Sequence, residues 1–270
     1  MPSEFVHLFL AGRVADVLPL SAADRPSFAL GSVAPDVSNL LGLPRRTTHY
    51  RDDPNGDEVS GAVQLLSAHP ELASHRLSSA GRALVAGCLC HLIADEQEVL
   101  VVHRPHTSRA ERHAGGRQAR RELRTALLVV MERRAASTGP WLPSAVTALR
   151  AAVAGHAGTH HGTPEDVLPF APLRHVLAWA QLVLSVAALP PGLDRLLRFR
   201  ALPPAEVRRD GTAEDFPRRY AAVETELLRR VPDEALEAFE RVSVTQSAAF
   251  VRAYLTGSPL PVPEGTVNPT

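Results

Sequence analysis

Residues 79–102 read SAGRALVAGCLCHLIADEQEVLVV, and this stretch decides the fold class. Its apolar positions recur at intervals of three and four residues, which is the period of an α-helix with one buried face. One stripe of that helix carries Leu84, Cys88, Leu92, Asp95 and Val99, and His91 flanks the stripe. The stretch therefore predicts a long helix that holds a histidine and a carboxylate against apolar surroundings.

The same helical period extends over most of the 270 residues. Ser3 can cap a first helix that runs to about Leu18, with Glu4 favourable in its first turn. Residues 19–60 are expected to be irregular, because prolines interrupt them. Further helices are expected at 59–68, 79–102, 116–135, 142–155, 172–188, 213–230 and 232–256.

These patterns predict an all-α fold, because no stretch of useful length alternates apolar and polar residues as a strand does. We see no convincing linker or internal repeat, so a single-domain helical bundle is expected. We expect a metal-binding helical domain at 1–256 and a proline-rich, disordered tail at 257–270.

The composition excludes several classes of protein. Hydrophobic residues make up 45% of the chain and the formal net charge is zero, so no basic field points to nucleic acid. Cys88 and Cys90 are too close together for a useful disulfide and are expected to be small core residues. The first apolar run lacks a preceding basic region and is interrupted by charges, so neither a signal peptide nor a transmembrane segment is predicted. We expect a cytoplasmic protein.

His91 and Asp95 are the first candidate functional pair. They stand four residues apart, so their side chains meet on one face of the predicted helix. A carboxylate against an apolar stripe is costly unless it is paired or binds a metal ion. The pair therefore suits a cation held by imidazole and carboxylate. A structural His–Asp hydrogen bond is the alternative.

Three more residues are candidate metal ligands, although the sequence pattern around each is less specific. His7 shares a helical stripe with apolar residues, where a core histidine is the alternative. Asp36 ends the turn Leu30–Asp36, where an aspartate can instead cap the next helix. His49 lies in the segment TTHYRD, where an exposed histidine is the alternative.

The order of these segments resembles the zinc-dependent phospholipase C family, which is related to fungal single-strand nucleases. The resemblance covers about residues 5–100. Four segments carry it: FVHLFLAGRVAD (5–16), FALGSVAPDV (28–37), TTHYRDD (47–53) and LVAGCLCHLIADE (84–96). It implies an all-α fold of the phospholipase C and nuclease type, with a metal cluster at the bottom of a cleft.

The resemblance also implies roles for individual residues. Asp36, His49, His91 and Asp95 would surround one zinc ion, while His7 would hold a second and Asp95 would bridge the two. Two such ions stabilise both oxygens of a displacement at phosphorus. Asp36 would be the catalytic carboxylate that orients or deprotonates water. Nitrogen and oxygen ligands suit one or two zinc ions, and also manganese or iron.

Two features depart from the family pattern. The family founders use a processed N-terminal amine as a ligand, whereas this sequence begins Met-Pro. They also hold a third zinc ion through a later histidine and a His-x-x-x-Glu pair. In this sequence, His103 is a candidate for the later histidine, and His161 and Glu165 have the His-x-x-x-Glu spacing. Gly162 and Pro164 lie between the members of that pair and disfavour a helix at this point. A solvated, histidine-rich loop is the alternative.

Three functions follow as alternatives. The first is a metal-dependent hydrolase that acts on a phosphoester of a small-molecule or lipid-like substrate, such as a phospholipid or another phosphodiester. The second is a Lewis-acid enzyme of a biosynthetic pathway, which would catalyse a cyclisation, an elimination or the cleavage of an amide or ester. The third is a non-catalytic helical binding protein. Arg45 and Arg46, just before His49, can receive a phosphate or lie on a solvated helix face.

Overall fold

The structure is a computed structural model, and it describes residues 2–50, 60–108, 116–156, 167–202 and 215–261. Helices dominate these residues and none of them lies in a β-strand, which confirms the predicted all-α class. The helices up to residue 76 are α1 (Glu4–Val17), α2 (Arg25–Gly31), η1 (Ala34–Val37), α3 (Ser38–Leu41), α4 (Arg45–His49), α5 (Gly61–Ala68), η2 (Pro70–Leu72) and η3 (Ser74–Arg76). The later ones are α6 (Ser79–Glu98), the π-helix η4 (Val99–Thr107), α8 (Arg117–Ser137), α9 (Trp141–His156), α10 (Leu173–Val186), α11 (Leu193–Ala201), α12 (Phe216–Arg230) and α13 (Asp233–Thr256).

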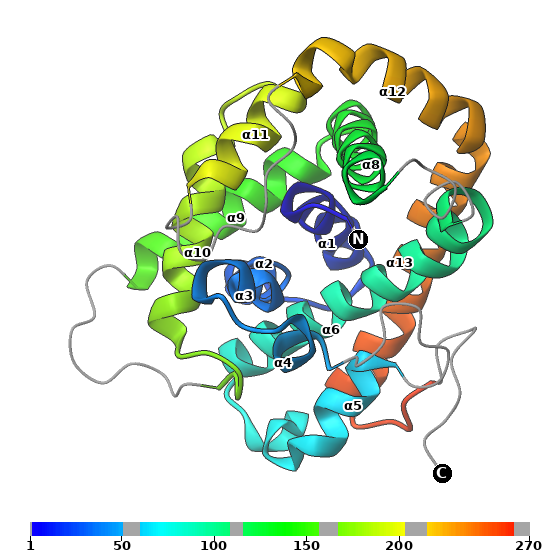
Figure 1. The fold of residues 1–270 in the computed structure, drawn as a ribbon. Coiled ribbons are helices and arrows are strands. Elements are labelled where there is room, and N and C mark those ends of the chain that lie inside the picture. The colour runs from blue at the N-terminus through cyan, green and yellow to red at the C-terminus, as the bar shows by residue number, and fades with distance from the viewer. Residues whose placement is uncertain (1, 51–59, 109–115, 157–166, 203–214, 262–270) are drawn as a thin grey trace.

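Helix α1 runs through the middle of the molecule, as Figure 1 shows. Every residue from Glu4 to Ala11 is buried, so α1 has no solvent face over its first two turns. It packs against α9, α13, α6 and α8, which surround it. A helix that is apolar on all sides belongs in the centre of a core. Glu4 and His7, the polar residues of these two turns, therefore lie inside the protein.

Helix α6 is the second central element. Ser78 caps it, because the Ser78 hydroxyl accepts a hydrogen bond from the backbone N–H of Gly81 at 3.1 Å. All residues from Ala83 to Glu98 are buried against α2 and α13 on either side. Cys88 and Cys90 lie in this buried stretch as free cysteines, in agreement with the expectation of small core residues.

Helices α2 and α6 cross at an unusually short distance, and two glycines make this possible. A Cβ atom on Gly31 would lie 2.0 Å from the backbone oxygen of Leu84. A Cβ atom on Gly87 would lie 2.1 Å from the backbone oxygen of Phe28. Since neither position tolerates a side chain, the glycines fix the contact between α2 and α6. This contact sets the position of η1, which follows α2, relative to the histidine and aspartate of α6.

The expectation that residues 19–60 are irregular was wrong. Four short helices, α2, η1, α3 and α4, occupy much of this segment. Pro26 and Pro35 lie in the first turns of α2 and η1, and Pro44 occupies the N-cap position of α4. Proline is tolerated at the start of a helix because the first N–H groups have no partner within the helix. The prolines therefore begin these helices instead of interrupting one.

Other helix boundaries also differ from the prediction. Helix α11 was not expected, and α6 continues into the π-helix η4, which includes Pro105. Ser3 occupies the N-cap position of α1, but its hydroxyl is buried and makes no hydrogen bond. The expected end at residue 256 is confirmed, because Gly257 terminates α13 with a φ of 68°. Residues 262–270 of the predicted tail lie outside the described residues.

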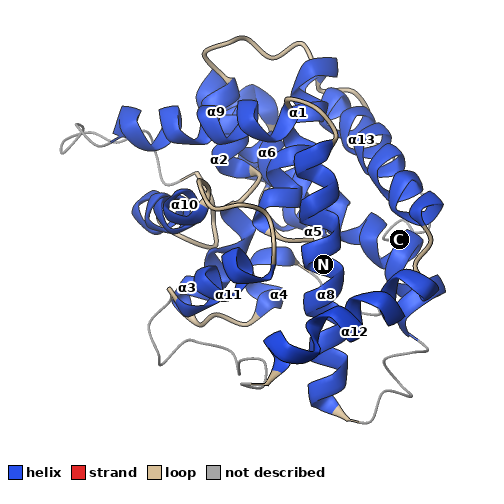
Figure 2. Cartoon of the chain, turned by 90° about the horizontal axis from the view of Figure 1, so that it is seen from above, coloured by secondary structure: helices blue, strands red, loops and turns tan. Residues whose placement is uncertain are grey.

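No helix in the described part of the chain is both long enough and apolar enough to cross a bilayer. Figure 2, a view from above, shows the helices arranged around α1, α2 and α6, with α12 and α13 along one side. The candidate site lies where α1, η1, α4 and α6 meet.

Candidate metal centre

The structure brings together all five residues that were singled out as the principal metal ligands. We call this group the His/Asp cluster. Its members are His7 of α1, Asp36 of η1, His49 of α4, and His91 and Asp95 of α6. Each is buried, with an exposed fraction of at most 4%. Burial of so many polar groups at one point is costly unless something compensates them.

One part of the cluster joins the two histidines of α4 and α6. The Nε2 atoms of His49 and His91 lie 3.2 Å apart. Asp36 Oδ1 lies 3.5 Å from His49 Nε2, and Asp36 Oδ2 lies 3.9 Å from His91 Nε2. These three residues can hold one metal ion, because a ligand atom from each lies within 4.8 Å of the other two.

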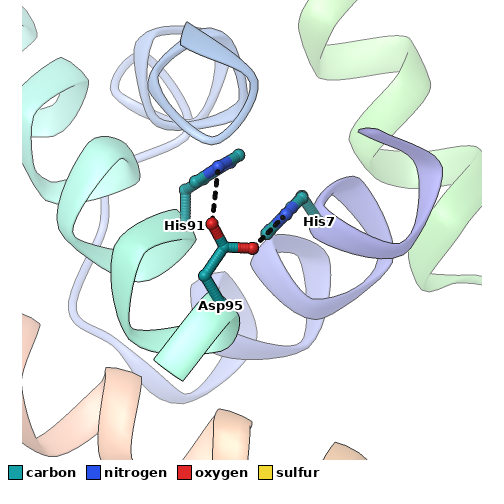
Figure 3. Close-up of side chains that lie close together, drawn as sticks. All are labelled: His7, His91 and Asp95. Carbon is teal, nitrogen blue, oxygen red and sulfur yellow. Dashed lines mark ion pairs between the residues drawn. The ribbon is translucent and has the colours of Figure 1, made fainter. Parts of the chain in front are cut away.

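Asp95 connects this part to α1. Its Oδ2 atom lies 3.5 Å from His49 Nε2 and 3.7 Å from His91 Nε2. Its Oδ1 atom lies 3.3 Å from His7 Nε2, as Figure 3 shows. The rings of His7 and His91 stack with their centroids 3.6 Å apart. His7, His91 and Asp95 thus form a second possible metal-binding group.

Hydrogen bonds at the far side of each ring fix which nitrogen faces the cluster. His91 Nδ1 lies 2.8 Å from the backbone oxygen of Ser32, which only accepts, so Nδ1 donates and Nε2 carries the lone pair. His49 Nδ1 lies 2.8 Å from the Thr48 hydroxyl. That hydroxyl donates to the backbone oxygen of Arg45 at 3.3 Å, so it accepts from His49 Nδ1. The lone pairs of the two Nε2 atoms therefore face each other.

Two lone pairs at this distance repel each other unless a cation lies between them. Tetrahedral zinc, with Zn–N distances of about 2.0–2.1 Å, separates two nitrogen ligands by about 3.3 Å. The observed separation of the His49 and His91 Nε2 atoms, 3.2 Å, matches that value. The neighbouring carboxylate oxygens lie 3.5–3.9 Å from these nitrogens. The donor set and its spacing therefore fit a divalent metal ion.

The backbone conformation next to His49 also bears on how this histidine is positioned in the cluster. Helix α4 ends at His49, and Tyr50 follows with a φ of 52°, the only non-glycine residue with positive φ in the described chain. This left-handed conformation is costly for a tyrosine and persists only where the surroundings enforce it. The Tyr50 hydroxyl lies 3.0 Å from His69 Nε2, which holds the side chain after the turn. The turn ends α4 at the residue that enters the cluster.

Arg45 can balance the negative charge of the two carboxylates in place of a metal ion. Its Nη1 atom lies 3.4 Å from Asp36 Oδ1, and its Nη2 atom makes a close ion pair with Asp95 Oδ2. Its side chain is 24% exposed, so it covers the solvent side of the cluster. The sequence offered Arg45 as a phosphate ligand or as part of a solvated face. In the structure, it pairs with two candidate metal ligands.

The pKa values of the cluster favour metal-binding protonation states. Burial would raise the pKa of Asp36, but the positive charge that His91 takes up at low pH, together with the nearby Arg45 guanidinium, outweighs it and lowers that pKa. Burial is likewise outweighed at Asp95, whose pKa is lowered well below its ordinary value by Arg45 and then by His7. Burial, followed by repulsion from His7, lowers the pKa of His91 to about 3. Ionised carboxylates and neutral imidazoles are the forms that bind metal ions.

Of the three weaker candidates, His103 is the one that the structure describes, and it does not join the cluster. His103 is buried in η4, where its Nδ1 atom lies 2.8 Å from the Thr107 hydroxyl, and it belongs to neither possible metal-binding group. His161 and Glu165 lie outside the described residues, so their role stays a prediction. Nothing in the described part of the chain supports a third metal position.

One residue near the cluster was not singled out as a ligand. Glu4 stands one helical turn before His7 and is 7% exposed. Burial, and then the charge of Asp36, raise its pKa well above the ordinary value. From the sequence, Glu4 was expected only to be a favourable charge in the first turn of a helix. The Glu-x-x-His spacing on an apolar helix was the signal that could have identified it.

Comparisons with known proteins do not assign the chain to a family. The structural fit of the cluster and the resemblance of its motifs are therefore separate observations. No family model, no curated protein and no solved structure matches the chain.

Proposed function

We propose that the protein is a metal-dependent hydrolase of the zinc-dependent phospholipase C type, which acts on a phosphoester of a small or lipid-like molecule. The observation that supports it most is the pair of Nε2 lone pairs of His49 and His91, 3.2 Å apart among buried carboxylates. Asp36 and Asp95 complete the donor set. The resemblance of four sequence segments to that family supplies the reaction class.

The protein's own residues prepare the site for hydrolysis. A divalent ion held there supplies Lewis acidity and lowers the pKa of water. The lowered pKa of Asp36 makes this carboxylate a weak base, so we assign it to accept a hydrogen bond and orient water. Arg45, at the exposed side, offers a guanidinium that can pair with an anionic group. Ser32 and Thr48 hold the two imidazoles in the required tautomer.

The decisive experiment combines metal analysis with turnover. Protein purified with added zinc, manganese or iron should retain at least one ion per chain. It should hydrolyse bis(p-nitrophenyl) phosphate or p-nitrophenyl phosphorylcholine. His91→Ala should lose both properties, whereas His106→Ala, a histidine of η4 outside both groups, should keep both.

Two other outcomes point elsewhere. Less than half an ion per chain would support a non-catalytic helical protein, in which Arg45 alone compensates the carboxylates. Retained metal without turnover of any phosphoester would reject the hydrolase proposal. It would redirect the search to Lewis-acid chemistry on carbonyl substrates, which the same donor set also suits.

A further inference from the structure

Helix α5 contains no member of the His/Asp cluster, but it packs against two elements that do, α4 and α6 (Figure 1). Its start is joined to α6 by hydrogen bonds. Glu96 Oε1 accepts one from the backbone N–H of Gly61 at 2.7 Å and one from the Ser60 hydroxyl at 2.9 Å. All three residues are buried, where a hydrogen bond is stronger than in water. Glu96 directly follows Asp95, so the start of α5 is fixed next to a candidate ligand.

The end of α5 is joined to α4. His69 occupies the C-cap position of α5, where its backbone N–H donates to the backbone oxygen of Leu65 at 3.1 Å. Its Nδ1 atom lies 2.9 Å from Glu71 Oε1, a carboxylate oxygen that only accepts, so in the neutral ring Nδ1 donates and Nε2 keeps the lone pair. The Tyr50 hydroxyl, 3.0 Å from Nε2, therefore donates to His69. Tyr50 directly follows His49, so the end of α5 is fixed next to a second candidate ligand.

Helix α4 needs such support from outside. It has five residues, too few for a helix that is stable by itself. The hydrogen bond between Thr48 and His49 lies within α4, so it orients the ring but does not place α4 relative to α6. Arg45 does connect α4 to α6, but through Asp95, whose oxygen an ion would also use. The bonds at the two ends of α5 connect the same helices without using an atom of the cluster.

We infer that α5 acts as a brace of the metal centre: it sets the separation of His49 on α4 from His91 and Asp95 on α6, and thereby the affinity for the ion. A site binds its ion tightly when its ligands are held within about 0.5 Å of the required geometry. The positioning residues of the brace are the four whose side chains make the hydrogen bonds at its ends: Tyr50, Ser60, His69 and Glu96. The inference rests on the proposed function for its metal ion, but not for its reaction.

The experiment measures the zinc affinity of the full-length protein by competition with a chromophoric chelator at about pH 8, where imidazole is neutral. Tyr50→Phe keeps the ring and removes the hydroxyl, and Ser60→Ala removes one of the two hydrogen bonds to Glu96. Each should weaken zinc binding about fivefold, the change in a dissociation constant that corresponds to one hydrogen bond of about 1 kcal/mol. The double variant should weaken it about 25-fold, because the two changes lie at opposite ends of α5.

Two controls separate the brace from other effects of substitution. Tyr220→Phe also removes a tyrosine hydroxyl, one that donates to Glu224 at 2.7 Å in α12, and should bind zinc as the wild type does. His69→Gln offers an amide oxygen to Tyr50 and should retain most of the zinc affinity, whereas His69→Leu should match Tyr50→Phe. Tyr50→Phe combined with His69→Leu should bind no more weakly than either alone, because both remove the same hydrogen bond.

A spectroscopic measurement distinguishes the brace from a contribution to folding alone. In the cobalt-loaded protein the visible absorption reports the geometry of the ligands, so the bands should shift in Tyr50→Phe and Ser60→Ala but not in Tyr220→Phe. A contribution to folding alone would instead lower the free energy of unfolding in EDTA and leave the zinc affinity and the cobalt bands unchanged. That result would overturn the brace.

Failure of the brace and failure of the proposed function give different results. Wild-type zinc affinity in both Tyr50→Phe and Ser60→Ala would reject the brace and leave the proposed function in place. The expected losses of affinity in a protein that turns over no phosphoester would support the brace and reject the hydrolase. A wild type that binds neither zinc nor cobalt would reject both.

Discussion

Two groups of buried charges in this protein differ in how their polar atoms are paired. Between α8 and α11, Glu132 and Arg195 are 1% and 3% exposed. Arg195 Nε and Nη2 donate to Glu132 Oε2 at 3.1 and 2.7 Å, and the guanidinium lies over the Phe5 ring at 3.9 Å. One positive charge faces one negative charge, with hydrogen bonds that satisfy both.

The His/Asp cluster is buried to the same degree but lacks this balance. The Nε2 lone pairs of His49 and His91 face each other, and His7 has no hydrogen bond at either ring nitrogen. Arg45 meets two carboxylates at once, Asp36 and Asp95. Buried charges whose partners all lie within the protein need no ligand, whereas buried polar atoms without partners need another explanation, such as a bound ion or water. The difference between the two groups can be tested by removing one member of each.

The largest effect is expected in the complete pair. Glu132→Leu leaves the buried Arg195 charge without its partner, so the free energy of unfolding should fall by about 3–5 kcal/mol. His7→Leu, measured in EDTA, should change it by less than about 1 kcal/mol, because neither ring nitrogen of His7 makes a hydrogen bond that the substitution would remove. Urea denaturation measures both. Equal losses in the two variants would mean that both groups are structural.

The next effect is that of metal on stability. At an ion concentration of 100 times the dissociation constant, binding to the folded state alone adds about 2.7 kcal/mol to the free energy of unfolding. The wild type should show this gain with zinc and lose it with EDTA. Glu132→Leu is less stable without metal, but zinc should raise its free energy of unfolding by the same amount. Zinc should not raise the free energy of unfolding of His91→Ala. A gain of equal size in His91→Ala would place the ion elsewhere.

The sequence pattern was informative for long helices and for side chains in apolar surroundings. Helices α1 and α6 were predicted because their apolar positions are many and periodic. His7, His91 and Asp95 were identified because a polar residue on such a helix must be buried. The short helices α2 and α4 were missed, since a helix of one or two turns offers too few positions for a period to show.

Contacts that depend on tertiary structure could not be read from the sequence. Arg45 pairs with Asp95, which lies 50 residues later in the chain, and no local pattern indicates that partner. Ser32 orients His91 through a backbone oxygen, a group that every residue carries. The short crossing of α2 and α6 that makes this hydrogen bond possible depends on Gly31 and Gly87 together. The candidate ligands could therefore be predicted from the sequence, but the groups that hold them in place could not.

A smaller effect is expected from one of these supporting groups. Thr48→Val keeps the shape of the side chain but removes the hydroxyl that holds His49 Nδ1. Loss of such a supporting hydrogen bond typically weakens metal binding by about 10–100-fold. Thr125→Val is the matched control, because Thr125 is a buried threonine of α8 that contacts Arg200. Isothermal titration with zinc should show weaker binding in Thr48→Val only, and unchanged affinity there would remove Thr48 from the site.

The smallest effect is the response of the metal-free protein to acid. In the unfolded chain, a histidine takes up a proton as the pH falls below about 6.5, whereas the pKa of about 3 keeps folded His91 neutral. The unfolded state therefore binds more protons, and the stability that neutral His91 contributes is complete above pH 6.5 and is lost as the pH falls.

Between pH 7 and 5.5 this loss amounts to about 1 kcal/mol for one histidine. We expect His91→Ala in EDTA to be less sensitive to acid than the wild type by that amount. The raised pKa of Glu4 acts in the opposite direction in both proteins, so it cancels in the comparison. His106→Ala should retain the wild-type response. If His91→Ala lost as much stability as the wild type over this range, His91 would not be a buried neutral histidine, and the facing lone pairs that support the metal centre would not exist.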